Sequence, residues 1–357
     1  MQEFASQFPV LSNYTYLNTA SCGLLSKSLV AWRREEDNNL KQGGSIYRDT
    51  HKPHIESIRK TVASFFKAGE HEVALIPNFS FGLNTLLEGI PKGQKVLLLE
   101  RDYPSINWSV ERRDFDLCYA TIDAKLEQNI ERAVAEHRPD IFAFSIVQYL
   151  SGIKIDFDFL RKLKAYNPNL LLIADGTQYF GTEPFSFAES PIDVVGCSTY
   201  KWLLAGYGNG FLMVKEAAQS RISPKTIGFN SADATFGKKE IIPFMRYFEP
   251  GHQDTLTYGS LEQSIQYLNS LNFEVVSEKT RILSSLAKDK FAEKGLLDTS
   301  TLNREAHSNI FNLLAGEKTF QKLKENNIIC SRRGHGIRVG FHFYNSEEDL
   351  SELLSFL

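Results

Sequence analysis

The chain lacks the features that mark membrane, secreted and zinc-binding proteins. Its 357 residues include only four cysteines, and no CxxC pair occurs, so we expect neither a disulfide framework nor a zinc knuckle. No apolar run approaches the roughly 20 residues that cross a bilayer. The first residues, MQEFASQFPVLS, lack the basic and then apolar pattern of a signal peptide. These absences predict a cytoplasmic protein with no membrane partner.

A strong excess of one charge sign is also missing. Lys and Arg number 40 and Asp and Glu number 43, and this net charge of -3 gives no sign of a nucleic-acid partner. His51 and His54 form an HxxH pair without a third ligand placed to help, so we expect no bound metal. The length of the chain predicts one large domain and a smaller one.

Short apolar runs alternate with helical patterns over the first two thirds of the chain. The runs that predict strands are residues 73–76, 95–99, 118–122, 141–147, 170–174, 192–197 and 210–214. This alternation predicts an α/β fold with a large, doubly wound and mostly parallel sheet. Ligands of such sheets bind beyond the carboxyl ends of the strands.

The pattern changes after about residue 244. Long helices are expected at 260–271 and 278–294, followed by a strand-rich stretch and a final helix. We therefore predict a large cofactor domain over residues 21–244 and a small α+β domain over 245–357. The N-terminal segment 1–20 is expected to join the small domain.

Two charged residues follow buried strands in the middle of the chain. Asp175 comes directly after the apolar run LLLIA, and Lys201 lies in the string CSTYKW after the next run. A charge at such a place is costly unless an opposite charge or a ligand meets it. A buried ion pair would satisfy both residues, but it would not explain Gln178, three residues after Asp175.

Pyridoxal phosphate (PLP) explains all three residues. Its pyridine nitrogen takes a carboxylate, its phenolic oxygen takes a hydrogen-bond donor, and its aldehyde forms a Schiff base with a lysine. A carboxylate that keeps the ring nitrogen protonated makes the ring an electron sink for the substrate Cα. We therefore predict that Asp175 and Lys201 are catalytic, and that Lys201 moves the Cα proton once the substrate has displaced it.

The string ADGTQ, followed by STYK, resembles the signature of the class V aminotransferase superfamily. This superfamily includes cysteine desulfurases, selenocysteine lyases, kynureninases and isopenicillin N epimerases. Further segments similar to family motifs are 16–21, 248–252 and 337–345, so the resemblance covers nearly the whole chain. It implies the PLP-dependent transferase type I fold, PLP as cofactor and an amino acid as substrate.

The resemblance also implies a role for each matching residue. Asn78, Phe79 and Ser80 occupy the phosphate-binding turn before a helix, where backbone N–H groups and the helix dipole favour an anion. The other matches contact the cofactor or the substrate: Ser198 at the phosphate, Gln178 at the phenolic oxygen, Tyr103 on the ring face and Arg338 at the substrate α-carboxylate. Arginine suits that carboxylate because it offers two parallel hydrogen bonds.

Some positions depart from the family pattern. Tyr200 stands where a histidine often precedes the lysine, and Gln148 stands where an asparagine is common. His252 replaces the threonine that reaches the phosphate of the other subunit in a homodimer. We predict cofactor contacts for Tyr200 and His252, a substrate contact for Gln148, and a homodimer with shared active sites. The loop that carries the nucleophilic cysteine of desulfurases is absent, and Cys330 is the only thiol nearby.

Several functions stay open at this point. A class V aminotransferase is the default, and the segment KWLLAGYGNGFLMV resembles epimerase-like members, which supports an amino-acid epimerase or racemase. A cysteine desulfurase or lyase is disfavoured by the absent loop. A non-catalytic PLP-binding protein is a further alternative, because a fold does not fix a function. Simpler roles also exist for single residues: a surface edge strand for Arg338, core packing for Tyr103, a plain loop amide for Gln148 and a surface loop for His252.

Overall fold

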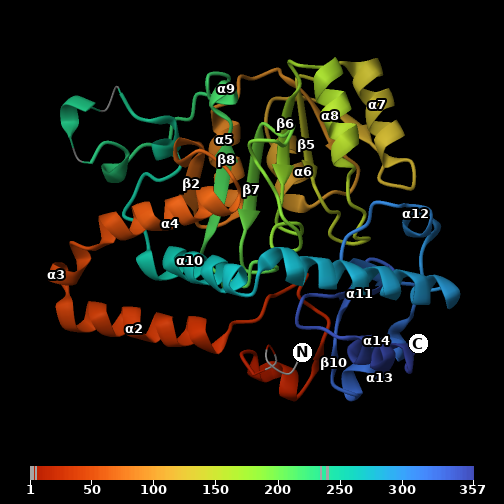
Figure 1. The fold of residues 1–357 in the computed structure, drawn as a ribbon. Helices are drawn as coiled ribbons and strands as arrows, with labels where there is room; N and C mark the ends of the chain where they lie inside the picture. The colour runs from red at the N-terminus through yellow and green to blue at the C-terminus, as the bar shows by residue number, and fades with distance from the viewer. Residues whose placement is uncertain (1–3, 5, 234, 239–240) are drawn as a thin grey trace.

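A seven-stranded sheet lies at the centre of the molecule, in the order β2-β8-β7-β6-β5-β3-β4 (Figure 1). The computed structural model describes residues 4, 6–233, 235–238 and 241–357. The strands are β2 (Val73–Ile76), β3 (Lys95–Leu99), β4 (Asp116–Ala120), β5 (Ile141–Ser145), β6 (Leu171–Asp175), β7 (Val194–Ser198) and β8 (Gly210–Val214). Within this sheet β8 runs antiparallel to both of its neighbours, β2 and β7, and the other described pairings are parallel. The expected α/β fold with a mostly parallel sheet is confirmed.

Helices cover both faces of the sheet because successive strand residues point to opposite sides. On β3, Leu97 and Leu99 join one hydrophobic cluster, whereas Val96 and Leu98 join the other. The first cluster is closed by α4 (His51–Phe65), α7 (Leu126–His137), α8 (Phe157–Tyr166) and α10 (Thr255–Ser270). The second is closed by α5 (Phe79–Glu88), α6 (Pro104–Glu111) and α9 (Glu216–Gln219). Among the described residues, no helix is both long and apolar enough to cross a membrane.

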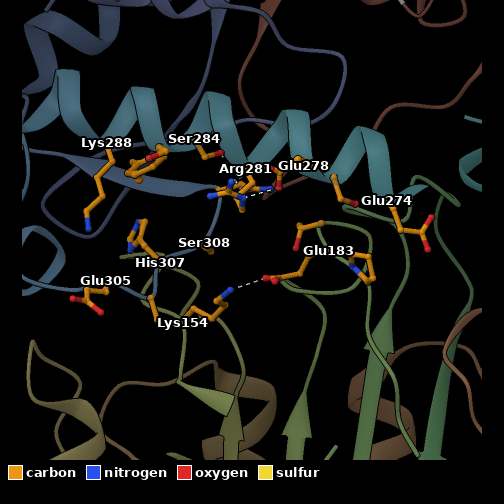
Figure 2. Close-up of a pocket in the computed structure, with 17 residues that line it drawn as sticks. Lys154, Glu183, Glu274, Glu278, Arg281, Ser284, Lys288, Glu305, His307 and Ser308 are labelled. Carbon is orange, nitrogen blue, oxygen red and sulfur yellow. Dashed lines mark hydrogen bonds and ion pairs between the residues drawn. The ribbon is translucent and has the colours of Figure 1, made fainter. Parts of the chain in front are cut away.

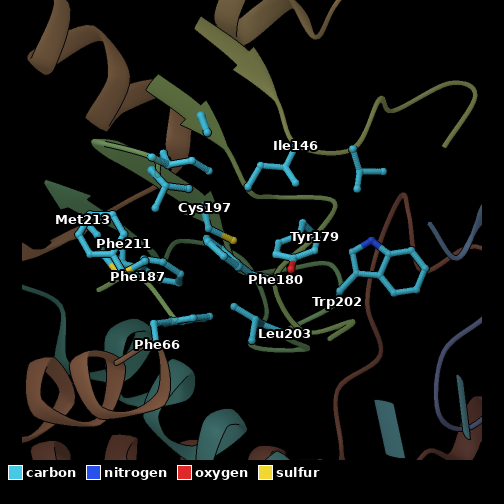
Figure 3. Packing of buried hydrophobic residues seen from close by; sticks show 14 of the residues in the cluster. Phe66, Ile146, Tyr179, Phe180, Phe187, Cys197, Trp202, Leu203, Phe211 and Met213 are labelled. Atoms are coloured by element: carbon cyan, nitrogen blue, oxygen red, sulfur yellow. The ribbon is translucent and has the colours of Figure 1, made fainter. Parts of the chain in front are cut away.

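Several aromatic rings of the first cluster pack together near β7 and β8 (Figure 3). The ring of Phe66 lies 4.7 Å from that of Phe180 and 4.8 Å from that of Phe211. Cys197 is part of the same cluster, and burial raises the pKa of its thiol well above the ordinary value. Trp202, next to Lys201, is also buried there. This packing holds the end of β7 in one position.

The C-terminal part forms a second, smaller core. Its three-stranded sheet has the order β11-β12-β9, with β9 (Ile310–Leu313), β11 (Ser331–Arg333) and β12 (Gly336–Gly340). Around it lie α11 (Phe273–Glu293), α12 (Thr299–Leu302), α13 (Glu317–Glu325) and α14 (Glu347–Leu354). The N-terminal strand β1 (Thr15–Tyr16) pairs with β10 (Ile328–Ile329), and Leu17 belongs to this core. The boundaries 1–20, 21–244 and 245–357 stay a prediction.

An N-terminal helical arm lies to one side of the sheet (Figure 1). It consists of α2 (Lys27–Gly43) and α3 (Ser45–Arg48), and α2 packs against α10. The short 3-10 helices are η1 (Pro9–Ser12), η2 (Glu70–Glu72), η3 (Phe229–Ser231), η4 (Phe236–Lys238) and η5 (Phe244–Tyr247). Along α2 only Leu29 is buried, so most of this helix faces outward within a single chain.

The segment before α2 passes directly against the backbone of Lys201. The N–H of Gly23 donates to the Tyr200 carbonyl at 2.8 Å. A Cβ atom at Gly23 would lie 2.0 Å from the Lys201 carbonyl oxygen, so only glycine permits this approach. The contact brings Ser21 within 2.6 Å of Arg338, which joins the N-terminus to the small sheet.

A buried ion pair secures the chain before α10. Arg59 donates to the two oxygens of Glu249 at 2.6 and 2.7 Å, and the Leu75 N–H donates to the same carboxylate at 2.7 Å. We expect Glu249→Ala to lower the free energy of unfolding by about 3–5 kcal/mol, because the largely buried Arg59 loses its counter-charge. Urea denaturation measures this. Glu278→Ala is the control, since Glu278 pairs with Arg281 on the exposed surface, and an equal loss in both variants would contradict the prediction.

Candidate active site

The carboxyl ends of β6 and β7 bring Asp175 and Lys201 to the same place. Two adjoining cavities meet there, one of about 560 Å³ and one of about 10 Å³, and both are bounded by Tyr103, Asp175 and Thr177. The larger cavity is also lined by Asn78, Phe79, Ser80, Ser198 and Tyr200, and the smaller one by Gln178 and Lys201. The structure therefore brings together every predicted cofactor contact except His252.

The N-terminus of α5 forms a cradle for an anion. Asn78 caps this helix, since its side-chain oxygen accepts from the Phe81 N–H at 2.9 Å. The Ser198 hydroxyl oxygen accepts from the Phe79 N–H at 2.9 Å, which leaves the hydroxyl hydrogen available to a ligand. The hydroxyls of Ser80 and Ser105 are 2.7 Å apart. The Ser80 N–H in the first turn, the helix dipole and these hydroxyls all favour a phosphate at this end of the cavity.

Asp175 is a buried carboxylate without a full counter-charge. Its side chain accepts from the Thr177 N–H at 2.8 Å. Burial raises the pKa of Asp175 to about 6, the nearby Asp102 acts in the same direction, and hydrogen bonds from Thr177 and the charge of Lys201 oppose the rise. A protonated pyridine nitrogen would stabilise the charged form of this carboxylate. The environment of Asp175 thus fits the ring nitrogen of PLP.

Lys201 is a buried amine with a lowered pKa. The pKa of Lys201 is lowered to about 8: burial is the main cause, Arg338 and Arg333 act in the same direction, and Asp175 opposes them. The Nζ atom lies 5.4 Å from the ring centre of Tyr103 and 5.6 Å from that of Tyr200. A lowered pKa leaves more of the amine neutral near pH 7, which is the form that attacks an aldehyde.

Arg338 is buried and lacks an anionic partner among the described residues. It is 3% exposed and lies on β12, the central strand of the small sheet, so the alternative of a surface edge strand is wrong. Its Nη1 donates to the Tyr149 carbonyl at 2.7 Å and its Nη2 to the Ser21 hydroxyl at 2.6 Å, while the buried Nε has no partner. Burial lowers the pKa of Arg338 to about 10. Such a cation favours binding of a carboxylate.

The two predicted glutamines differ in the hydrogen bonds that their side-chain amides already make within the chain. Gln178 accepts from the Trp202 indole N–H at 2.8 Å and donates to the Ala20 carbonyl at 2.9 Å, so one amide hydrogen remains for a ligand. The side-chain oxygen of Gln148 accepts from the N–H groups of Leu150 and Ser151, both at 2.7 Å. Gln148 therefore stabilises the turn at 148–152 and lines neither cavity. Its substrate contact stays a prediction.

His252 lies apart from the cavity of Lys201 within one chain. It is exposed, and its ring centre is 4.7 Å from that of Phe229. It lines a different hollow of about 340 Å³ together with Arg48, His51 and Arg246. A role at the phosphate of a second subunit would require a dimer, and it stays a prediction.

Several residues of the site were missed in the sequence. Buried Asp102 accepts from the N–H groups of Tyr103 and Ser145, both at 2.7 Å, and so ties two strand ends together. Thr177 binds Asp175, and Tyr149 lies edge-to-face on Tyr103 at 5.1 Å. Asp102 follows the end of β3, so the rule for residues beyond strand ends was sufficient to find it.

A second cavity of about 490 Å³ lies between α11 and the residues before β9 (Figure 2). Two ion pairs lie among its side chains: Lys154 pairs with Glu183 at 2.7 Å, and Arg281 pairs with Glu278 at 2.6 Å. None of the predicted site residues lines this cavity. It is therefore not the place where Lys201 would meet a ligand.

Together, the parallel sheet, the anion cradle and the buried carboxylate and amine define a PLP-dependent enzyme of fold type I. The pattern described as "Aminotransferase class-V" matches residues 27–353, and the chain belongs to this family. The cofactor of the protein is pyridoxal 5'-phosphate, and the donors around the cavity fit it.

The relatives span several reactions. The chain is 22% identical to an uncharacterized aminotransferase, YcbU, of Bacillus subtilis, covering 98% of this chain and 95% of YcbU. It is 23% identical to isopenicillin N epimerase of Amycolatopsis lactamdurans, covering 99% and 96%. A cysteine desulfurase from Thermococcus onnurineus has a similar fold, with a TM-score of 0.88, 18% identity and coverage of 99% and 96%. A variant of C-DES, in which glycine is covalently linked to the PLP cofactor, has a TM-score of 0.83 and 20% identity. The match covers 98% of this chain and 98% of that one.

Proposed function

We propose that the protein is a class V aminotransferase that acts at the Cα of an amino acid through a Schiff base on Lys201. One observation carries this proposal: buried Asp175 and Lys201, from neighbouring strands, border adjoining cavities with the N-terminus of α5 at one end. When bound, PLP supplies the electron sink that stabilises negative charge on Cα.

Each residue of the site then has a distinct role. Asp175 holds the proton on the ring nitrogen, and the N-terminus of α5 and Ser198 hold the phosphate. Arg338 binds the substrate α-carboxylate, because its buried guanidinium has only neutral partners, Tyr149 and Ser21. The neutral Lys201 amine takes the proton from the substrate Cα and later donates it as the product forms.

Spectroscopy and covalent labelling test the proposal. We expect the purified protein to absorb in the visible, and borohydride followed by peptide mapping to find the cofactor on Lys201. A panel of amino acids should then change the absorbance and yield keto acid. A label on another lysine would overturn the proposal, and an absorbance that no amino acid changes would favour a non-catalytic PLP-binding protein.

The second candidate is an amino-acid epimerase or racemase. The similarity to isopenicillin N epimerase and the segment KWLLAGYGNGFLMV favour it. An epimerase converts one enantiomer into the other without a keto-acid acceptor, whereas an aminotransferase requires that acceptor. Chiral analysis of the amino acid after incubation with and without a keto acid separates the two reactions.

Sulfur chemistry at Cys330 is disfavoured by the position of this residue. The side chain is half-buried and packs against the small core, and burial raises the pKa of its thiol to about 12. Because the thiolate is the nucleophile, we expect Cys330→Ser to keep the main activity within about twofold. Keto-acid and sulfide assays measure this. If cysteine is the substrate and the variant loses sulfide release but keeps its cofactor, a desulfurase is favoured instead.

We also propose a homodimer in which His252 reaches the phosphate of the other subunit. Apolar side chains exposed on the arm and on the neighbouring loops favour a second copy there: Leu40, Ile46, Ile227, Phe229 and Ile241. Sedimentation is expected to show a dimer, and His252→Ala should weaken PLP retention several-fold because it removes a phosphate donor. Exposed His71→Ala is the control. An active, PLP-loaded monomer would contradict the shared site, and unchanged retention would contradict only the role of His252.

The place of the protein in the cell stays a prediction. All four cysteines are unpaired, which is compatible with a reducing cytoplasm.

A further inference from the structure

We infer that Arg333 selects amino acids whose side chain carries a second anionic group, a carboxylate or a phosphate. The inference rests on the proposed function, because it takes Arg338 as the residue that binds the α-carboxylate. Arg333 would then bind the other end of the same substrate.

Strand register places both arginines on one face of the small sheet. Ser331 is paired with Arg338 across β11 and β12, so their side chains share a face, and Arg333 shares it as the second residue along. Contacts confirm the shared face for Ser331 and Arg338, since both side chains reach Ser21. The Ser21 hydroxyl lies 3.1 Å from that of Ser331 and 2.6 Å from Arg338 Nη2. Arg332 lies on the opposite face and pairs with Glu317 at 2.7 Å.

A hydrogen-bonded link holds the backbone of Arg333 close to the site. The side-chain amide of Asn312 donates to the Arg333 carbonyl at 2.9 Å and to the Leu150 carbonyl at 3.3 Å. The residue before Leu150 is Tyr149, whose carbonyl binds Arg338 and whose ring touches Tyr103. The backbone of Arg333 therefore lies close to the segment that binds Arg338, and the charge of Arg333 adds to burial in lowering the pKa of Lys201 and of Arg338.

No residue in the described part of the chain neutralises Arg333. No carboxylate among the described residues pairs with it, the side chain is exposed, and its cross-strand neighbour is Gly336, which has no side chain to cover it. The two carboxylates of the site, Asp175 and Asp102, are buried and accept from backbone N–H groups. The site thus carries two arginine charges, those of Arg338 and Arg333, whereas one α-carboxylate neutralises only one. A second anionic group on the substrate would complement the other charge.

Ligand titrations of the PLP-loaded protein test this inference. Dissociation constants are measured from cofactor absorbance for aspartate, glutamate and O-phosphoserine, and for the neutral counterparts asparagine, glutamine and serine. We expect wild type to prefer the anionic ligands, and Arg333→Gln to weaken them about tenfold or more while leaving the neutral ones unchanged. Comparing aspartate and glutamate with O-phosphoserine distinguishes a carboxylate site from a phosphate site.

Arg332→Gln is the matched control, because it removes a neighbouring charge from the opposite face. Added salt should reduce the wild-type preference and leave Arg333→Gln nearly unaffected. Equal binding of anionic and neutral ligands in wild type, or equal losses in the two arginine variants, would overturn the inference and leave the proposed function intact. If no amino acid changes the absorbance of wild type, the proposed function fails and this inference fails with it.

Discussion

Lys201→Ala is expected to hold PLP without a covalent bond and to lose turnover. Loss of proton transfer alone lowers such a rate by about 10²–10⁴-fold, and loss of the covalent attachment adds to this. Alanine fills less space than lysine but introduces no charge, so the buried cavity near Tyr103 and Asp175 should survive. Borohydride reduction, mass spectrometry of the intact protein and single-turnover kinetics measure the effect.

A second lysine supplies the control for this experiment. Lys215 also has a pKa lowered by burial, but it follows β8 and donates to the carbonyl of Ser190, away from both cavities. Lys215→Ala should keep the covalent cofactor and the turnover. If Lys201→Ala keeps both and Lys215→Ala loses them, the lysine was assigned wrongly.

The lowered pKa of Lys201 adds a pH dependence to the same test. Without PLP, the amine becomes neutral as the pH rises through about 8. The rate at which the cofactor-free wild type takes up PLP covalently should therefore rise up to about pH 8 and then level off. Stopped-flow absorbance at a series of pH values measures it, and a rate that keeps rising to pH 10 would contradict the lowered pKa.

Asp175→Asn is expected to lower turnover by about 10²–10³-fold, the usual cost of removing one preorganised electrostatic partner. Asparagine has the same shape and can still accept from the Thr177 N–H, so the fold around β6 should remain. It carries no charge, and the proton on the ring nitrogen is no longer held. The loss should therefore appear in kcat and in Cα proton exchange more than in KM.

Deuterium exchange at Cα, followed by NMR, measures that step directly. Asp102→Asn serves as the control, since Asp102 is buried nearby but its carboxylate accepts from Tyr103 and Ser145 rather than facing the ring position. Asp102→Asn should lower the free energy of unfolding, with a smaller effect on the rate of Cα deuterium exchange. Unchanged exchange in Asp175→Asn would show that Asp175 has a structural role.

The strands of the large sheet were predictable because each is a short apolar run. Boundaries were less certain: the strand expected at 118–122 is β4, Asp116–Ala120, and the helix expected from residue 260 begins at Thr255. There the Asp254 side chain caps the helix by accepting from the Thr257 N–H at 3.1 Å. Helix α2 was not identified, because burial of Leu29 alone leaves little apolar periodicity to detect.

The central part of the site was predictable for a similar reason. Asp175, Gln178 and Lys201 follow consecutive strands of a parallel sheet, so chain order already places them at one edge. Residues that reach the site from the small sheet were less accessible. Arg338 was identified through the family resemblance, whereas nothing in the sequence distinguished Arg333 from its neighbour Arg332.

The amino-acid order therefore settles what depends on neighbours along the chain: the strands, the helices, and the charged residues that end buried runs. Tertiary structure alone decides what depends on segments far apart. It brings Ser21 to Arg338, engages the side-chain oxygen of Gln148 in its own turn, and places Arg333 on the face of Arg338 but Arg332 on the face of Glu317. The physical reason is that register and burial arise only when distant strands pair, and no local pattern records which face a side chain will take.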